Sequence, residues 1–491
     1  MEFQNRGPEL LTNEQMSYAD KLAIDNGKTG FDLMRAAGNG IFKVLRKSWT
    51  WRKVLVLCGP GNNGGDGFIV AALLRDAGWP VKIGMHGEIS SLTGDAALAA
   101  KFWNDNVQKI SADLLSGVDL IVDGLFGAGL ARNIDGYLMD IINKVNESGI
   151  DCLSIDMPSG IDGNTGQVKG IALRANETVT FFRKKPGHLL IPGKLHSGKI
   201  HIVDIGMNES VLHEIKPNLA ENIPQNWLEY MPRPSLDDHK YSRGQTVIVG
   251  GEDMPGAARL AALAARRVGS GLATIVANKK AEKKYFGGDP GCLFKPLLRT
   301  ESFKEIISNP RVNAVLVGPG SGVNDETLLR VKISLKMMKA TVIDADALTV
   351  FQDNPKYLFD LIKGPTVMTP HSGEFTRLFD NSLDKLSSCR TAAKLSGAIV
   401  LFKGSDTVIS APDGRSVINC NAPPALATAG SGDVLAGFIA GLLTQGMPVF
   451  EAVSAGVWLH GEAANILGKG LIAEDITSTL PQVLNTLWTL Q

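Results

Sequence analysis

The sequence of 491 residues is short of cysteine, of aromatic residues and of any excess charge. Its five cysteines are odd in number and scattered, and none forms a C-x-x-C pair, which argues against a disulfide framework and against a zinc site. Lysine plus arginine and aspartate plus glutamate both total 50, so no global field attracts nucleic acid or an anionic membrane. These absences favour an enzyme that acts on small molecules in a reducing cytosol.

The sequence also lacks a long hydrophobic run and a recognisable targeting segment. No window approaches the roughly 18 uninterrupted apolar residues that a membrane-spanning helix needs. The opening residues, MEFQNRGPELLTNEQ, contain neither the basic nor the apolar region of a signal peptide. We therefore expect a soluble, cytoplasmic protein.

What the sequence does have is glycine, 54 residues of it, and short apolar runs that alternate with helical segments. A capping box at Thr12 and Gln15 and a cap at Thr29 predict a helical pair at the start. Each apolar run that follows precedes a glycine or proline turn, which is typical of a parallel, doubly wound α/β sheet. The runs of the first half are 54–57, 81–85, 120–122, 152–155 and 179–181.

This regularity falters between residues 207 and 238, a polar stretch with four prolines, and we place a domain boundary there. A second alternating series follows and ends in apolar helices. We therefore predict an α/β protein of two domains, a Rossmann-like domain over 1–215 and a second α/β domain over 225–491.

Gly59, Gly61 and Gly64 in VLVLCGPGNNGGDGF formally satisfy the dinucleotide motif G-x-G-x-x-G. We expect these glycines to form a tight turn and the helix after them to cover 68–76, with backbone N–H groups pointing at an anion. A hydride-carrier site further needs an acidic residue at the end of the second strand, where this chain has His86. The pattern therefore indicates nucleotide binding without favouring a dehydrogenase.

Three aspartates lie at strand ends of the first domain, in GPGNNGGDG, VDGLFGAGL and IDMPSGIDG. Because such ends share one edge of a parallel sheet, we expect Asp66, Asp123 and Asp156 in one crevice, joined by Asn63 and Ser159. Such an oxygen-rich set could hold a hard cation. One aspartate at a strand end is often only a cap, but three at one edge favour a site.

These motifs, together with TVTFFRKKPGHLLIPG, resemble the epimerase domain of the bifunctional NAD(P)HX epimerase/dehydratase family over about residues 10–215. NAD(P)HX is NAD(P)H hydrated at carbon six of the nicotinamide, in R and S forms. The resemblance implies that Asp156 lies at the reacting end and that Asn63, Asp123 and Ser159 ligate potassium. It implies further substrate contacts from Asn62, Asn63, Gly64, Gly65, Asp66, Gly127, Ala128, Gly129, Leu130, Ala131, Arg132 and Asn133.

Inversion of carbon six requires loss of its hydroxyl to give a stabilised iminium, followed by addition of water to the other face. A group of suitable pKa near that hydroxyl is needed. We choose Asp156, with Lys185 as its partner; Lys185 and the nearby His188 could each also be an ordinary solvated residue.

In the second domain, ATAGSGDVLAGFIAGLL places Gly430, Ser431, Gly432 and Asp433 at the start of a long apolar helix. Helix N-terminal amides bind anions, and a carboxylate beside them can take a proton from a hydroxyl, so the motif is typical of phosphoryl transfer. The alternative is a simple helix cap. The additional strand-end motifs GPGSG, DADAL, TPHSGE and KGSDT favour a site.

With HKYSRGQTVIVGG, this set resembles the ribokinase-like fold and, more narrowly, the ADP- or ATP-dependent NAD(P)HX dehydratase domain, over about residues 225–488. The resemblance implies Asp433 as the base, Mg²⁺ as counter-charge, and phosphorylation of the hydroxyl followed by loss of phosphate. It implies contacts to the hydrate from Ala257, Gly320, His371 and Asp433, and to the nucleotide from Lys403, Gly404, Ser405, Asp406, Thr407 and Gly432. The chain departs from the family at Ala422-Pro423-Pro424-Ala425, where Gly-Asn-Pro-Gly is expected, and at Ser372, where proline is usual.

The sequence thus predicts a metabolite-repair enzyme with two active sites that act in succession on NADHX or NADPHX, and we expect a homo-oligomer. One alternative is a small-molecule kinase fused to a nucleotide-binding module. Another is a first domain that binds or scaffolds without turnover. Product analysis separates kinase from dehydratase, because a kinase leaves a stable phosphoester and the dehydratase releases free phosphate. The choice between ADP and ATP stays open.

Overall fold

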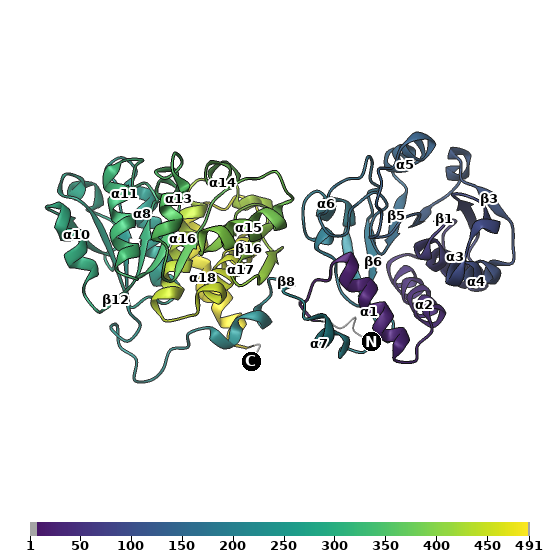
Figure 1. Ribbon diagram of the computed structural model, residues 1–491, viewed down its shortest axis with the longest axis horizontal. Helices are drawn as coiled ribbons and strands as arrows, with labels where there is room; N and C mark the ends of the chain where they lie inside the picture. The colour runs from purple at the N-terminus through teal and green to yellow at the C-terminus, as the bar shows by residue number, and fades with distance from the viewer. Residues whose placement is uncertain (1–6, 490–491) are drawn as a thin grey trace. The chain divides into compact units, whose positions relative to one another are not determined.

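The computed structural model describes residues 7–489, which divide into two compact units between Leu219 and Ala220 (Figure 1). This division lies between the two ends, 215 and 225, expected from the sequence. No helix among residues 7–489 has the length and apolar character needed to cross a lipid bilayer. All five cysteines are free thiols. Each unit is described below by itself.

Unit 1 is built on seven parallel strands in the order β3-β2-β1-β4-β5-β6-β7. The strand order reverses between β1 and β4, as in Rossmann-like folds, so the predicted doubly wound sheet is confirmed. The sequence did not predict the two edge strands, β3 and β7. The strands are β1 (Val54–Cys58), β2 (Val81–Met85), β3 (Val107–Lys109), β4 (Leu120–Gly124), β5 (Asp151–Ile155), β6 (Glu177–Phe181) and β7 (Lys199–Val203).

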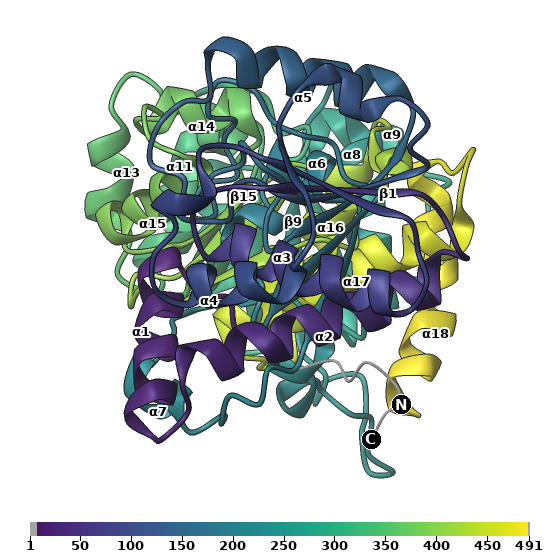
Figure 2. The same ribbon diagram turned by 90° about the vertical axis from the view of Figure 1, so that its right-hand side faces the viewer.

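Helices cover both faces of this sheet. Successive residues of β1 point to opposite faces and pack into two separate hydrophobic cores. Val54 and Val56 belong to the core beneath α2 (Gly30–Ser48), α3 (Asn62–Asp76) and α4 (Gly94–Trp103). Leu55 and Leu57 belong to the core beneath α5 (Gly136–Ser148). Figure 2, in which unit 1 faces the viewer, shows α5 on one side of the sheet and α2, α3 and α4 on the other.

The first helices begin where the sequence predicts. α1 (Asn13–Asp25) starts at a capping box in which Thr12 Oγ1 accepts from Gln15 N (3.2 Å) and Gln15 Oε1 accepts from Thr12 N (3.0 Å). Thr29 Oγ1 caps α2 by accepting from Asp32 N (3.1 Å). Two short helices, α6 (Gly193–Ser197) and α7 (Val211–Ile215), complete the unit.

The helix after β1 begins at Asn62, so the predicted turn through Gly64 and the helix start at residue 68 were wrong. Of the three motif glycines, only Gly59 and Gly61 precede the helix. A Cβ on Gly64 would lie 2.0 Å from the Gly59 carbonyl oxygen, and one on Gly59 only 1.7 Å from that of Leu125. The glycines therefore let the first turn of α3 sit directly on the strand ends, which brings Asn62 and Asn63 to the sheet edge.

Unit 2 has a ten-stranded sheet in the order β11-β10-β9-β12-β13-β14-β15-β16-β17-β8. The strands from β11 to β15 are parallel, and β16 is antiparallel to both its neighbours β15 and β17. The strands are β8 (Leu219–Glu221), β9 (Gln245–Val249), β10 (Leu272–Asn278), β11 (Leu293–Leu297), β12 (Val312–Val317), β13 (Ala340–Ile343), β14 (Thr366–Met368), β15 (Ile399–Phe402), β16 (Thr407–Ser410) and β17 (Ser416–Asn419). The α/β class expected for this unit is confirmed, although AIVLFKGSDTVIS forms two strands, β15 and β16, where the sequence suggested one.

Four helices of unit 2 pack into one large core against the sheet: α8 (Pro255–Arg267), α16 (Ser431–Thr444), α17 (Val449–Leu467) and α18 (Ala473–Trp488). Close packing of α16 on α8 depends on two glycines of α16. A Cβ on Gly437 would lie 2.3 Å from the Ala261 carbonyl oxygen, and one on Gly441 2.6 Å from that of Ala265. This contact fixes the N-terminus of α16 beside the strand ends. The remaining helices are α9 (Glu282–Tyr285), α10 (Thr300–Ile307), α11 (Asp325–Lys336), α12 (Asp346–Thr349), α13 (Pro355–Leu361), α14 (Ser372–Leu378) and α15 (Lys385–Ser396).

Candidate active sites

A pocket of about 620 Å³ lies in unit 1 where β1, β4 and β5 end. Its walls come from the start of α3, the loop after β4, the end of β5, the loop after β6 and one face of α1. Most residues that the resemblance assigned to the hydrate line it, but Gly64, Gly65 and Asn133 do not. The assigned residues in the wall are Asn62, Asn63, Asp66, Gly127, Ala128, Gly129, Leu130, Ala131, Arg132 and Asp156, with Lys185 beside them.

Asp156 is held in the pocket by an unusual backbone and several donors. It follows β5 with φ at +64°, in the left-handed region that few residues other than glycine adopt. Its carboxylate accepts from Ala128 N (3.2 Å) and Thr180 Oγ1 (3.1 Å), and the Lys185 ammonium forms a close ion pair with it. Burial alone would raise the pKa of Asp156, but the Lys185 ammonium and the other groups around the carboxylate, the Ala128 N–H among them, together outweigh burial, and the net pKa is lowered. Asp156 therefore stays ionised.

His188 fixes the backbone beneath this pair. Its Nδ1 accepts from Lys185 N (2.9 Å), so its Nε2 carries the proton and donates to the Asp156 carbonyl oxygen (2.8 Å). Burial, and then the Lys185 charge, lower the pKa of His188 to about 4, so the ring is neutral. His188 is thus a structural support of the two reactive side chains, and neither it nor Lys185 is solvated.

Two more carboxyl groups line the same pocket. Burial, and then the negative charges of Asp156 and Asp20, raise the pKa of Asp66 well above its usual range. Asp20 comes from α1 and was not found from the sequence. Burial and the Asp156 charge, partly opposed by Lys185, raise the pKa of Asp20 to about 6. The only sequence signal for Asp20 is its position on the helix face that carries the buried Met16.

Asp123 does not share the pocket, contrary to the expected crevice of three carboxylates. It is the fourth residue of β4 instead of following it, and it is fully buried. Its oxygens accept from Ser154 Oγ (2.9 Å), from Ser159 N (2.9 Å) and Oγ (2.5 Å), and from Leu125 N (3.3 Å). Asp123 and Ser159 therefore form a polar layer below the pocket floor.

Asn63 carries an orphaned polar group. Its Nδ2 is buried and has no hydrogen-bond partner in the described part of the chain. Turning the amide by 180° places the carbonyl oxygen there, and an unpartnered oxygen in a polar pocket suits a hard cation. Within residues 7–489, no group of three or more His, Cys, Asp or Glu side chains is arranged to hold a metal ion.

In unit 2, Asp433 lies in the first turn of α16 and caps nothing. Gly430, with φ at +86°, is the N-cap, and no side chain makes a capping hydrogen bond. The alternative of a simple helix cap therefore fails for Asp433. Burial, and then the Asp344 charge, raise the pKa of Asp433 to about 6, with Lys403 opposing the shift.

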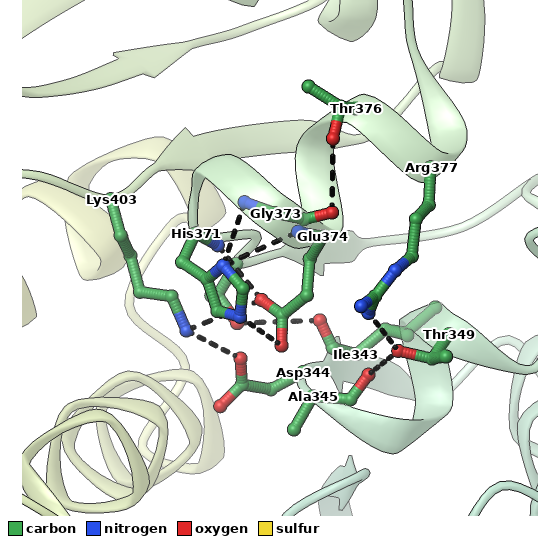
Figure 3. A network of polar contacts seen from close by, with 11 residues as sticks. Ile343, Asp344, Ala345, Thr349, His371, Gly373, Glu374, Thr376, Arg377 and Lys403 are labelled. Atoms are coloured by element: carbon green, nitrogen blue, oxygen red, sulfur yellow. Dashed lines mark hydrogen bonds and ion pairs between the residues drawn. The ribbon is translucent and has the colours of Figure 1, made fainter.

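Lys403 belongs to a buried network of charges shown in Figure 3. Its ammonium lies 2.9 Å from Asp344 Oδ1 and 3.8 Å from Glu374 Oε2. A Cβ on Gly432 would lie 3.7 Å from the same nitrogen, so Lys403 adjoins the start of α16. Burial lowers the pKa of Lys403, but Asp344 and Glu374 outweigh burial and the pKa is raised. Asp344 and Glu374 lie in the DADAL and TPHSGE motifs but were not assigned a role from the sequence.

His371 serves as the N-cap of α14 and does not join Asp433. Its Nδ1 accepts from Gly373 N (2.9 Å) and Glu374 N (3.3 Å), and Glu374 Oε2 accepts from His371 N (2.8 Å) (Figure 3). The His371 side chain is 56% exposed. Contact with a substrate would therefore come from its exposed edge.

The two other residues assigned to the hydrate lie together. Gly320 lines a pocket of about 610 Å³ with Asp346, and a Cβ on Gly320 would lie 3.3 Å from the Cβ of the buried Ala257. The Asp346 charge also raises the pKa of Asp433, so this pocket adjoins the start of α16.

The assigned nucleotide segment, 403–407, starts at Lys403 and turns from β15 into β16. Thr407 Oγ1 closes the turn by donating to Gly404 O (2.7 Å) and accepting from Gly404 N (3.2 Å), and Asp406 pairs with Lys385. Ser405 lies in the same turn, between Gly404 and Asp406 in the sequence. The departure at 422–425 leads into a short 3₁₀ turn over Pro424–Leu426, just before α16.

Comparisons with known proteins match both units. The family model described as YjeF-related protein N-terminus matches residues 30–187, and the model described as NAD(P)H-hydrate dehydratase matches residues 246–484. A bifunctional NAD(P)H-hydrate repair enzyme of Thermofilum pendens is 34% identical, covering 88% of this chain and 87% of its own. Those of Coxiella burnetii and Escherichia coli are each 32% identical, covering 97% and 94% of this chain and 99% and 90% of their own.

Among solved structures, an ADP/ATP-dependent NAD(P)H-hydrate dehydratase of Bacillus subtilis, co-crystallised with ATP/Mg²⁺, is 26% identical with a TM-score of 0.49. The match covers 54% of this chain and 98% of the other. By fold and sites, the chain is an α/β enzyme with one carboxylate-bearing site in each of two units. It belongs to the family of bifunctional NAD(P)H-hydrate repair enzymes, which the full-length relatives favour over a kinase fused to a binding module.

Proposed function

We propose that unit 1 interconverts the R and S forms of NAD(P)HX and that unit 2 dehydrates the S form to NAD(P)H at the expense of ADP or ATP. One observation carries the proposal. Each unit presents a carboxyl group at the sheet edge with a lysine charge acting on it. Lys185 is ion-paired with Asp156. Lys403, which is paired with Asp344, also acts on Asp433. A carboxyl group placed in this way allows proton transfer at a hydroxyl-bearing carbon.

In unit 1, Asp156 is the base. When the hydroxyl leaves carbon six, the ring nitrogen stabilises the cation, and the adjacent carboxylate stabilises it further. The same carboxylate takes the proton of the water that adds back. Lys185, bonded also to Thr180 Oγ1 (3.0 Å), keeps Asp156 ionised and oriented.

Potassium would be held by the Asn63 amide oxygen together with Asp123 and Ser159. The Asp123 Oδ1 and Ser159 Oγ atoms lie 2.5 Å apart, so one ion could contact both. Bound there, potassium supplies positive charge that orders the loop and the substrate. Replacing Asn63 with Ala should therefore weaken R/S exchange in potassium buffer far more than it weakens dehydration of the S form. Equal loss of both activities would remove the assignment.

In unit 2, Asp433 takes the proton of the carbon-six hydroxyl, whose oxygen then attacks the terminal phosphorus of the nucleotide. The backbone N–H groups at the start of α16 bind the phosphate oxygens, and Lys403 adds positive charge. The remaining nucleotide, AMP from ADP or ADP from ATP, leaves the phosphorus. The ring nitrogen lone pair then expels phosphate from carbon six, and loss of a proton from carbon five restores the dihydronicotinamide. Magnesium would arrive with the nucleotide phosphates and one carboxylate such as Asp346, where it supplies counter-charge.

The direct test is to incubate the full chain with hydrated NADH, with and without ADP or ATP. Recovery of the near-ultraviolet absorbance of the dihydronicotinamide, with one phosphate released for each molecule restored, is expected only with nucleotide. A stable phosphoester would indicate a kinase. Within this proposal the protein works in the cytoplasm as a homo-oligomer, which light scattering on the purified chain tests.

A further inference from the structure

We propose that Asp20 of α1 is the second acid–base group of R/S exchange, acting on the face of the nicotinamide opposite Asp156. The proposal rests on the function proposed for unit 1. It assigns a reacting group to a helix that the sequence identified only as a capped N-terminal element.

One face of α1 forms a wall of the unit 1 pocket. Asn13, Met16, Ser17 and Asp20 line it, at the spacing that places residues on one side of a helix. The opposite side of α1, which carries Tyr18, Lys21 and Asp25, is exposed. Asp20 therefore faces the space where substrate would bind, away from bulk solvent.

The Asp20 carboxyl has no partner that would explain it as a structural residue. No group in residues 7–489 donates a hydrogen bond to it. The nearest cation that acts on it, Lys185, is already bonded to Asp156 and Thr180. Asp20 is half-buried, and withdrawing an ionised carboxylate from water without a partner costs free energy. Asp20 relieves this cost by holding a proton, and its pKa of about 6 keeps both protonation states accessible.

The other charged groups around the pocket differ from Asp20 in their resting protonation state. Asp156 is held ionised by Lys185, and Asp66 is held protonated by burial and by its carboxylate neighbours. The basic residues of the lining are Lys185, which is bonded to Asp156, and Arg132, and neither is a carboxyl acid. The step opposite Asp156 needs an acid that can release its proton near neutral pH and recover it, and the pKa of Asp20, about 6, permits this.

The proposed step balances as follows. The protonated Asp20 gives its proton to the carbon-six hydroxyl, the carbon–oxygen bond breaks and water leaves, and the ring nitrogen lone pair forms the iminium. A water adds to the opposite face of carbon six and its proton passes to Asp156. The reverse reaction uses protonated Asp156 as acid and ionised Asp20 as base, and exchange with solvent restores the starting state.

The test compares Asp20→Asn with Asp25→Asn, a matched change at an exposed position of the same helix. We expect Asp20→Asn to slow R/S exchange by at least about 10²-fold and Asp25→Asn to leave it within about twofold. Dehydration of the S form by unit 2 should be unchanged in both variants, and an unchanged melting curve of the full chain should show that unit 1 is folded. Asp20→Glu should recover part of the activity and shift the pH profile.

The outcomes separate this proposal from the one on which it rests. A parent chain that catalyses no R/S exchange would overturn the function proposed for unit 1. A parent that exchanges, with Asp20→Asn within about threefold of it, would overturn only the role of Asp20. The Asp20→Asn variant could also be slow and still lose kcat/KM above about pH 6 as the parent does. That result would likewise overturn the role of Asp20, because a residue with only a structural role does not cause this fall in kcat/KM with pH.

Discussion

The two units shift the pKa of their reactive carboxyl groups in opposite directions. In unit 1, Asp156 is paired with Lys185, which lowers its pKa despite burial. In unit 2, the Lys403 ammonium pairs with Asp344 instead, and burial together with the Asp344 charge raises the pKa of Asp433 to about 6. The same side chain at the same kind of sheet edge is thus given different acidities by the placement of one lysine.

The difference suits the two reactions. Asp156 of unit 1 stabilises a cation that develops on the substrate, and Asp20 supplies the acid. Asp156 is therefore most effective when it is ionised. The carboxylate of unit 2 must take a proton from a hydroxyl, and a higher pKa makes it a stronger base. The predictions below break or sharpen this contrast, from the largest expected effect to the smallest.

Replacing Asp433 with Asn should abolish nucleotide-dependent dehydration and leave R/S exchange intact. Loss of a positioned base costs about 10²- to 10⁴-fold, roughly 3 to 5 kcal/mol of barrier. Because Asp433 caps nothing, the fold and the backbone anion site should survive. The measurements are recovery of dihydronicotinamide absorbance, ADP affinity and the melting curve. Dehydration within about tenfold of the parent would show that Asp433 is not the base.

Replacing Lys185 with Met should slow R/S exchange by about 10²-fold at neutral pH. Without the ammonium, burial dominates and the pKa of Asp156 rises, so less of the base is ionised. Lys184→Met is the matched control, because Lys184 does not line the pocket. Equal effects of the two changes would contradict the role of the Lys185–Asp156 pair.

The two activities should depend on pH in opposite directions. Asp433 reacts when ionised, so kcat/KM for dehydration should fall about tenfold per unit as the pH drops below about 6. Asp20 and Asp156 react with one proton between them, so kcat/KM for exchange should fall as the pH rises above about 6. Both rates can be measured on one preparation between about pH 5 and 8. Parallel profiles would remove the contrast between the units.

The sequence predicts the fold better than the sites, for physical reasons. A strand buried on both faces, such as β1, is a continuous apolar run that can be recognised locally. The edge strands β3 and β7 are polar in part and resemble loops. The start of α3 was missed because its N-cap, Gly61, carries no side-chain signal.

The same limit applies to the candidate sites. Motifs at strand ends made Asp156 and Lys185 candidates, since a parallel sheet gathers such residues at one edge, and a helix-start motif did so for Asp433. Asp20 was not found, because helical periodicity shows that α1 is amphipathic but not which part of its buried face meets a pocket. Capping by His371 was also missed, because it depends on where α14 begins.

The smallest expected effect comes from separating the units, provided that the chain is divided before β8 so that β8 stays with unit 2. Asn222, next to β8, is buried in unit 2, where its Nδ2 donates to Asn419 Oδ1 (2.9 Å) and Ser454 O (2.8 Å) and its Oδ1 accepts from Trp227 Nε1 (3.2 Å). We therefore expect a fragment that starts at Lys216 to dehydrate the S form within about threefold of the full chain. A fragment that starts at Gln225 removes the buried hydrogen bonds that Asn222 makes with Asn419 and Trp227, at a cost of about 1 to 3 kcal/mol each, and should melt several degrees lower. Equal melting temperatures of the two fragments would show that unit 2 does not require β8 and Asn222, whereas loss of activity in both would indicate that unit 2 does not function alone.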